Sequence, residues 1–181
     1  MIVPTPWLER TFSFDFPVNL LPNIIERLRG TPARLEDRLH GVPREVLTDH
    51  VGARWSIQEH AGHLLDLGDL ERTRLAEFTA GQQQLSRADL SNRKTNEANH
   101  NERELADLLA EFRRERDEFV RALEAADESF AGRSAIHPRL GKPMRLVDFA
   151  FFIAEHDDHH LAAISRILKT ANYNSGITGN T

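Results

Sequence analysis

Two of the nine histidines in this 181-residue chain have a spacing that suits metal chemistry. His156 and His160 are four residues apart, and at about 100° per residue both fall on the same helix face as Phe149 and Ile153. Burying an unpaired polar group costs about 1–3 kcal/mol, so two imidazoles on an apolar face need a physical reason. The spacing lets one helix offer two imidazoles to one metal ion, although the sequence HDDHH lacks the glutamate of a metalloprotease helix.

The polar neighbours of this pair leave its role open. Asp157 also turns toward the apolar face, where it can support a histidine ligand, act as a further ligand, or pair with a lysine or arginine. His159 falls on the opposite, polar face with Glu155. The two histidines of the apolar face can equally be core residues with hydrogen-bond partners, so spacing alone does not decide between a metal site and a structural role.

A third ligand has to come from elsewhere in the chain, and His60 and His63 belong to a second segment with helical periodicity. His60 lies near the centre of the apolar arc, whereas His63 lies at its flank beside Leu67 and Leu70. Because cysteine is absent, any metal must be held by His, Asp, Glu or backbone oxygen. Periodicity favours His60, but the choice between the two stays open on spacing alone.

Four helices are needed to position these residues. Apolar residues recurring with a helical period predict helices over 18–40, 56–80, 102–127 and 144–169. Asn101 and Glu104 form a capping-box pattern at the start of the third helix, whereas Gly30 and Pro32 predict a kink or break in the first. This pattern predicts an all-α four-helix bundle in a single domain, residues 1–181.

The segments between the helices have distinct compositions. Residues 1–17 form a proline- and aromatic-rich arm that should pack on its own bundle or on a second subunit, which favours a homodimer. Residues 82–101 are a long polar connection, and residues 129–143 are turn-rich enough for a short hairpin. Residues 170–181 are expected to form a flexible C-terminal tail.

Composition argues against several classes of function. The chain has 23 Lys and Arg against 28 Asp and Glu, a net charge of −5, so a nucleic-acid surface is not expected. Arg113, Arg114 and Arg116 alternate with glutamates, which is typical of a solvated, salt-bridged face. The longest apolar run, 149–154, is far shorter than the roughly 20 residues of a membrane span. We therefore expect a cytoplasmic protein with a small-molecule substrate and neither nucleic-acid nor membrane partners; no secretory signal is evident.

Two motifs taken together resemble the DinB-like superfamily. The segment WSIQEHAGHL at 55–64 matches the pattern W-S-x-x-E-x-x-x-H-L, and residues 156–160 supply H-x-x-x-H. The resemblance implies an up-down-down-up bundle, in which the parallel second and third helices need a long crossover such as 82–101. It also implies one divalent metal bound by three histidines.

The matching ligand positions in this chain are His63, His156 and His160. In this interpretation His60 occupies a position that is usually apolar in the superfamily, so it is a core histidine or supports a ligand from the outer shell. The metal is expected to be zinc or nickel, with iron or manganese also able to accept imidazole ligands. Since metal binding requires neutral imidazole, occupancy should fall as the pH drops through about 6.5.

Three imidazoles with a position left for water or substrate are typical of a catalytic site. Characterised members of the superfamily include bacillithiol S-transferases and mycothiol-dependent maleylpyruvate isomerases. The resemblance therefore implies a metal-dependent S-transferase, isomerase or hydrolase, and any thiol must be a low-molecular-weight cofactor because the chain has no cysteine. A non-catalytic stress-response protein that binds metal or a small molecule is the alternative, and a purely structural bundle is a third.

The polar connection leaves two further questions. Glu97, Asn99 and His100 lie in a segment long enough to reach over the site, although a solvated loop is the simpler interpretation. A di-iron carboxylate centre would need two Glu-x-x-His motifs, and only Glu97–His100 has that spacing, outside the predicted helices. No catalytic residue is assigned from the sequence.

Overall fold

The computed structural model describes residues 4–50, 52 and 54–177. In chain order its elements are η1 (Trp7–Glu9), η2 (Val18–Leu20), α1 (Leu21–Leu39), α2 (Arg44–Thr48), α3 (Ile57–Asp66), α4 (Gly68–Thr79), α5 (Arg93–Glu97), η3 (His100–Glu102), α6 (Leu105–Glu124), α7 (Glu128–Ala131), β1 (Ser134–His137), β2 (Lys142–Arg145) and α8 (Leu146–Ile177), where η marks a 3₁₀-helix.

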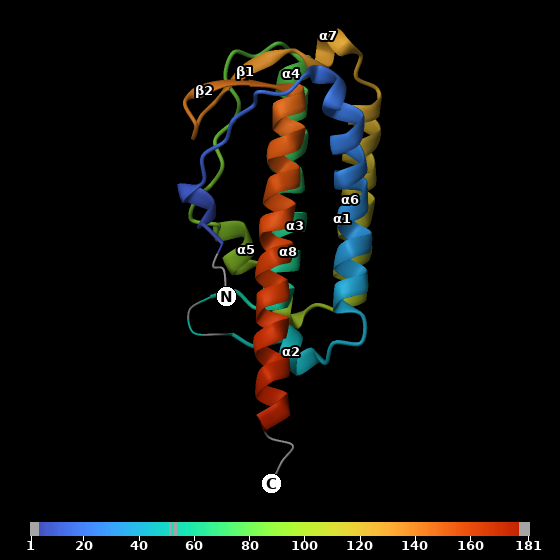
Figure 1. The fold of residues 1–181 in the computed structure, drawn as a ribbon, viewed down its shortest axis with the longest axis vertical. Helices are drawn as coiled ribbons and strands as arrows, with labels where there is room; N and C mark the ends of the chain where they lie inside the picture. Colours follow the sequence, from blue (N-terminus) through green and yellow to red (C-terminus); the bar gives the residue numbers. More distant parts are fainter. Residues whose placement is uncertain (1–3, 51, 53, 178–181) are drawn as a thin grey trace.

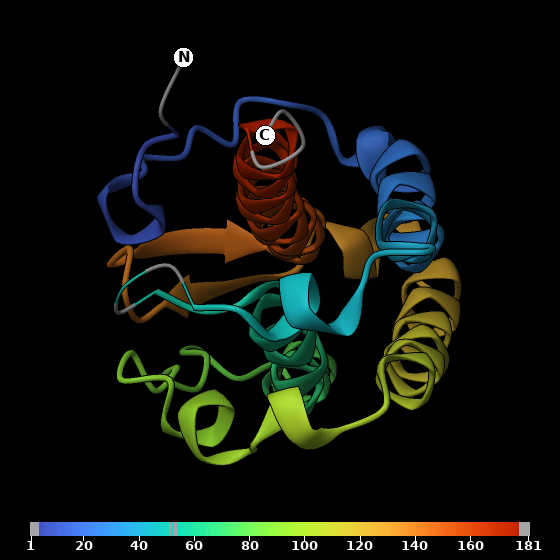
Figure 2. The ribbon, with the colours of Figure 1, turned by 90° about the horizontal axis from the view of Figure 1, so that it is seen from below.

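The long helices α1, α6 and α8 form a bundle with α3 and its continuation α4 (Figure 1). Seen along the bundle, α1 packs against both α6 and α8, and α3 packs against the same two helices from the opposite corner (Figure 2). The predicted helical bundle is confirmed. None of the described helices is both long enough and apolar enough to cross a membrane.

Two apolar clusters hold the bundle together. The first joins the arm, the hairpin and the first half of α8, and it ends on α8 at Ile153. The second joins the C-terminal half of α1 to α3, α6 and the later part of α8, where it includes Leu161 and Ile164. His156 and His160 therefore lie between two packed regions of the same helix, which holds their backbone rigidly.

The predicted break at Gly30 and Pro32 is wrong, because α1 is one continuous helix from Leu21 to Leu39. A proline inside a helix removes one hydrogen bond and costs about 3 kcal/mol. Leu28 and Leu35, on either side of it, are both 0% exposed. Burying one leucine fully gains about 1.5–3 kcal/mol, so the packing of these two side chains offsets the lost bond.

Three other boundaries differ from the prediction. The second predicted helix is divided at Leu67 into α3 and α4. The capping box expected at Asn101 and Glu104 is absent: Glu104 precedes α6 without a side-chain cap bond. Helix α8 continues to Ile177 instead of ending near 169, so the first part of the predicted tail is helical, and residues 178–181 lie outside the described part of the chain.

The aromatic arm packs on its own bundle. Trp7, Phe12, Phe14 and Phe16 all belong to the first apolar cluster or lie against it. The hairpin expected within 129–143 is also present, with β1 and β2 antiparallel and Ser134 opposite Arg145. The homodimer suggested by the arm stays a prediction, which a monomer mass in sedimentation at micromolar concentration would contradict.

Candidate metal centre and its cavity

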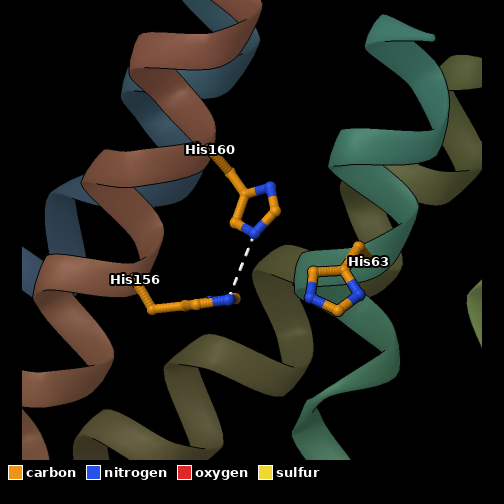
Figure 3. A group of neighbouring side chains, drawn as sticks. All are labelled: His63, His156 and His160. Carbon is orange, nitrogen blue, oxygen red and sulfur yellow. Dashed lines mark hydrogen bonds between the residues drawn. The ribbon is translucent and has the colours of Figure 1, made fainter. Parts of the chain in front are cut away.

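Three histidine side chains meet between α3 and α8. His63 comes from α3, and His156 and His160 come from adjacent turns of α8 (Figure 3). One ring nitrogen of each lies within 4.8 Å of the others, and all three residues are buried. The structure thus brings together the three histidines that match the family's ligand positions, close enough for one ion to reach them all.

The α3 end of this cluster is fixed by a capping box that the sequence analysis placed elsewhere. Ser56 accepts a hydrogen bond from the backbone N–H of Glu59, and the Glu59 carboxylate accepts one from the backbone N–H of Ser56. A cap of this kind contributes about 1 kcal/mol and sets where the helix begins. It therefore fixes the rotation at which His63 leaves α3, two turns later.

His160 has both ring nitrogens in contact with other histidines. Its Nε2 lies 3.1 Å from Nε2 of His156, and its Nδ1 lies 2.8 Å from Nδ1 of His60. His60 is not one of the three clustered residues. Its ring instead bonds to the far side of His160, which is the position of a group that orients a ligand from the second layer.

A hydrogen-bond chain fixes the protonation of His63. Nδ1 of His63 lies 3.0 Å from Oγ1 of Thr95, whose hydroxyl donates its single proton to the Asp66 carboxylate at 2.8 Å. The threonine oxygen can therefore only accept from His63, which places the imidazole proton on Nδ1 and leaves Nε2 free. A metal ligand needs such a free nitrogen.

His100 completes this chain from the crossover. Its Nε2 donates to Asp66 at 2.8 Å, and its ring packs so closely against α3 that a Cβ on Gly62 would lie 2.3 Å from it. Burial opposes the effect, but the bonds from His100 and Thr95 lower the pKa of Asp66, which keeps it a carboxylate. His100 thus acts behind His63, whereas Glu97 and Asn99, also considered from the sequence, are exposed and do not line the cavity.

The clustered imidazoles are held in their neutral form. Burial, the largest cause, lowers the pKa of His63 to about 4 and the pKa of His60 to about 4. Burial and the neighbouring histidines lower the pKa of His156 and of His160 well below 6.5. Neutral imidazole is the metal-binding form, so the donor set fits a divalent ion.

A cavity of about 330 Å³ opens beside the histidines. Its lining includes all three of them, the aromatic rings of Trp7, Trp55, Phe149 and Phe152, and the carboxyl group of Glu71. Leu8 and Leu90 also line it and are 57% and 56% exposed, so they mark its mouth. His159, expected on the polar face, is partly buried and lines the same cavity.

Trp55 is the aromatic residue nearest to the histidines. Its ring centroid lies 4.7 Å from that of His63, and its Nε1 donates to Oδ1 of Asn96 at 3.0 Å. Sequence analysis gave no role to Trp55, Asp66 or Thr95. A tryptophan next to a capping serine was visible in the motif, but no periodicity marks Thr95, because it lies in the crossover.

Asp157 does not belong to the metal centre. Its carboxylate accepts from Nη2 of Arg116 at 3.0 Å and from the hydroxyl of Thr31 at 2.8 Å, on the side of α8 that faces α1 and α6. Of the alternatives for Asp157, pairing with an arginine is the one observed. Arg116 is 2% exposed, so its predicted place on a solvated face is wrong, whereas Arg113 does form the expected surface pair with Glu36.

Comparison with known proteins agrees with this architecture. The description of the DinB superfamily matches residues 27–164, which is most of the chain. The chain belongs to the DinB superfamily. A solved structure, YfiT from Bacillus subtilis, described as a probable metal-dependent hydrolase with an unusual four-helix bundle topology, is similar with a TM-score of 0.78 and 16% identity. The match covers 91% of this chain and 94% of YfiT, and no curated protein matches in sequence.

Proposed function

We propose that this DinB-superfamily protein is a metal-dependent enzyme, most simply a hydrolase, that acts on a small molecule in the cavity. The observation that carries the proposal is the convergence of three neutral, buried imidazoles at the wall of a cavity. The description of YfiT as a probable metal-dependent hydrolase supports the same class. A purely structural role leaves the shared position of these imidazoles without a cause.

His63, His156 and His160 would hold the divalent ion, with zinc or nickel preferred. The chemistry that a bound ion supplies is Lewis-acid polarisation of a carbonyl group or of water. Thr95 holds the proton of His63 on Nδ1, and His60 holds the ring of His160 by its far nitrogen. These contacts keep the ligand nitrogens oriented before any ion arrives, which lowers the ordering cost of binding.

Glu71 would provide general acid–base chemistry, which a non-catalytic binding protein does not require. Its carboxyl group lines the cavity, and burial raises its pKa to about 7. A group that titrates near the working pH can both accept and return a proton. Since the chain has no cysteine, a thiol-dependent transfer or isomerisation would need a low-molecular-weight thiol to enter the same cavity.

Metal analysis of purified variants tests the ligand set. Wild type should carry about one divalent ion per chain, and His63→Ala, His156→Ala or His160→Ala should lose it while keeping helical circular dichroism. His159→Ala is the matched control, because it alters the neighbouring residue of the same helix, and it should keep the metal. If His60→Ala removes the ion and His63→Ala does not, the proposed ligand set is wrong.

Turnover tests the reaction class. The metal-loaded protein should be screened against esters, amides and lactones, and against electrophiles in the presence of small thiols. Glu71→Gln should lower kcat by about 10²–10⁴ with its metal content unchanged. Stoichiometric binding without turnover across both screens would contradict the enzyme proposal and favour a metal- or small-molecule-binding protein. Turnover only with a thiol would replace hydrolysis by transfer or isomerisation.

We also propose that the four long segments follow the up-down-down-up order. Residues His100 and Asn101 bond to Gln58 and Ser56 at the start of α3. The chain between α4 and α6 therefore returns along the length of α3 and α4 before α6 begins, which supports parallel packing of these two segments. An experimental structure with α6 antiparallel to α3 would contradict this order.

A further inference from the structure

A group of hydrogen-bond donors lies along the cavity from the histidine cluster. It consists of His137 at the end of β1, Arg139 in the turn of the hairpin and Arg74 on α4, all of which line the cavity. His137 and Arg74 are 2% and 4% exposed. None of the three belongs to the metal centre described above.

The unused donor of His137 can be assigned. The backbone N–H of Leu140 donates to Nδ1 of His137 at 3.3 Å, so Nδ1 is the unprotonated nitrogen and Nε2 carries the proton. Burial, with the charges of Arg74 and Arg139, lowers the pKa of His137 to about 3, so the ring stays neutral. Nε2 is buried and has no partner among the described residues.

Arg139 presents a second unused donor. Its Nη2 is buried without a partner, and no carboxylate of the described residues pairs with its guanidinium. Instead its Cζ lies 5.6 Å from the ring centroid of Trp7 and 5.4 Å from that of Phe152. Leaving a buried charged donor unsatisfied costs about 1–3 kcal/mol or more, so this arrangement suits an absent acceptor.

Arg74 adds a second positive charge to this region. It is held by the carbonyl oxygen of Ser86, which accepts from both Nε and Nη2, and burial lowers its pKa to about 10. Glu71 and Glu77 offset its charge in part. The charge of Arg139 has no such offset, because burial is the cause that lowers its pKa.

The donors lie within reach of a molecule bound at the histidines. The Trp7 ring contacts both ends: its centroid lies 4.8 Å from that of His156, while Arg139 lies on it as described. The His137 ring packs on Phe152, one helical turn or about 5.4 Å along α8 from His156. A ligand of one ring or a short chain can therefore span from Arg139 to the histidine cluster.

We propose that Arg139 and His137 form a carboxylate-binding subsite, so that the substrate of the proposed function is a small carboxylic acid with an apolar body. This inference rests on that function for its reacting end only. The two unused N–H groups match the two oxygens of a carboxylate, whereas a phosphate has more acceptor oxygens than these donors can satisfy. Trp7 and Phe152 supply apolar walls for the part of the molecule between the carboxylate and the reacting group.

Matched pairs of ligands test the subsite without turnover. Benzoate, phenylacetate and 3-phenylpropionate should each be titrated calorimetrically into the full-length protein at pH 7 beside their neutral amides. At least one carboxylate should bind at least tenfold more tightly than its amide, because the amide carries no charge for Arg139. Equal affinity in every pair would overturn the proposal.

Variants then locate the preference. Arg139→Gln should reduce the carboxylate affinity at least tenfold, to that of the amide, and His137→Phe should reduce it less because only one neutral donor is lost. Arg121→Gln, which removes the same charge from an exposed position on α6, should change it less than twofold. An equal loss in Arg121→Gln would show a non-specific charge effect and overturn the subsite.

The metal-deficient variant His63→Ala separates this inference from the proposed function. If the carboxylate preference persists there, the donors of the hairpin produce it whether or not a metal is bound. A preference that disappears with the metal would place the anion on the ion and overturn the subsite while leaving the proposed function intact. Metal-free wild type that still prefers carboxylates would contradict the proposed function alone.

Discussion

His156 and Asp157 are adjacent in the chain and both buried, but their polar atoms are treated in opposite ways. Asp157 faces α1 and α6, where Arg116 and Thr31 satisfy its carboxylate. His156 faces α3 and the cavity, where its only hydrogen-bond contact among the described residues is with His160. One side of α8 thus carries a closed polar network, and the other carries neutral donors that wait for a ligand.

This contrast separates structure from function in a way that burial cannot. Both residues are under 10% exposed, and a list of buried polar residues would treat them alike. A satisfied ion pair stabilises one arrangement of α8 against α1 and α6, whereas an unsatisfied cluster adds little to stability and retains capacity for binding. The following tests measure how complete that separation is.

The largest effect is expected at Asp157. Asp157→Ala leaves Arg116 as a buried charge with only Glu71 to pair with, and should lower the free energy of unfolding by about 3–5 kcal/mol. His156→Ala in metal-free protein should cost at most about 1 kcal/mol, since it removes a neutral group with weak partners. Urea unfolding with a chelator present measures both.

Asp158→Ala is the control for charge alone. Its carboxylate is 34% exposed and pairs with Arg27 and Arg34, so the change should cost less than about 1 kcal/mol. If Asp157→Ala fails to fold, Asp157→Asn, which keeps the shape and one acceptor, gives the measurable value. An equal cost for His156→Ala and Asp157→Asn would remove the distinction between the two sides of α8.

The pH dependence of stability should be dominated by the histidine side. The pKa of His63 is lowered from 6.5 to about 4, so between these values the unfolded chain binds a proton that the folded chain does not. The free energy of unfolding should therefore fall on acidification from pH 6.5 to about 4, by about 1.4 kcal/mol per pH unit for each such histidine. Burial raises the pKa of Asp157, which contributes in the opposite direction.

Urea unfolding of metal-free wild type and His63→Gln across this range isolates one histidine. The variant should have the shallower slope, by about 1.4 kcal/mol per pH unit. Parallel slopes would mean that His63 already takes up its proton near pH 6.5 in the folded state. The same shift moves the expected acid loss of metal from about pH 6.5 toward the lower pH at which His63 itself protonates.

A smaller effect is expected behind the ligands. Thr95→Val keeps the shape of the side chain but removes the hydroxyl that joins His63 to Asp66. Metal affinity should weaken by about 10–100-fold, measured by competition with a chelator. Thr79→Val, at an exposed hydroxyl that bonds only to its own helix, should leave the affinity unchanged; equal loss in both would assign the effect to the fold.

The smallest effect is expected at His60. His60→Ala removes the contact with Nδ1 of His160 but no ligand, so the metal should stay and its affinity should weaken by less than about tenfold. Competition with a chelator gives the value beside that of Thr95→Val. Complete loss of metal would place His60 among the ligands.

Much of the bundle was predictable because helical periodicity is a local signal. The α8 stripe placed His156 and His160 on one face, and they do meet. Periodicity misled at the flank of α3, where it favoured His60 and only the family motif pointed to His63. A helical wheel shows the direction of a side chain, but it does not show which neighbouring helix lies in that direction.

What the sequence could not predict depends on partners far along the chain. Arg116 looks like a surface residue among glutamates, and only the packing of α6 on α8 places Asp157 beside it. Thr95 bonds to His63 across the crossover, where no repeat or period constrains it. The continuity of α1 through Pro32 likewise follows from the burial of its neighbours, because tertiary packing overrides a local breaker.

The attachment of residues 4–17 to α8 has a consequence for biosynthesis. Trp7 packs on His156, and Arg10 pairs with Glu155, 145 residues later. A ribosome adds about 5–20 residues per second, so the aromatic arm leaves it at least about 7 s before its binding surface is made. During that interval neither the cavity nor two of the three clustered histidines exist, so the nascent arm is exposed to chaperones and any metal must be inserted after translation of α8.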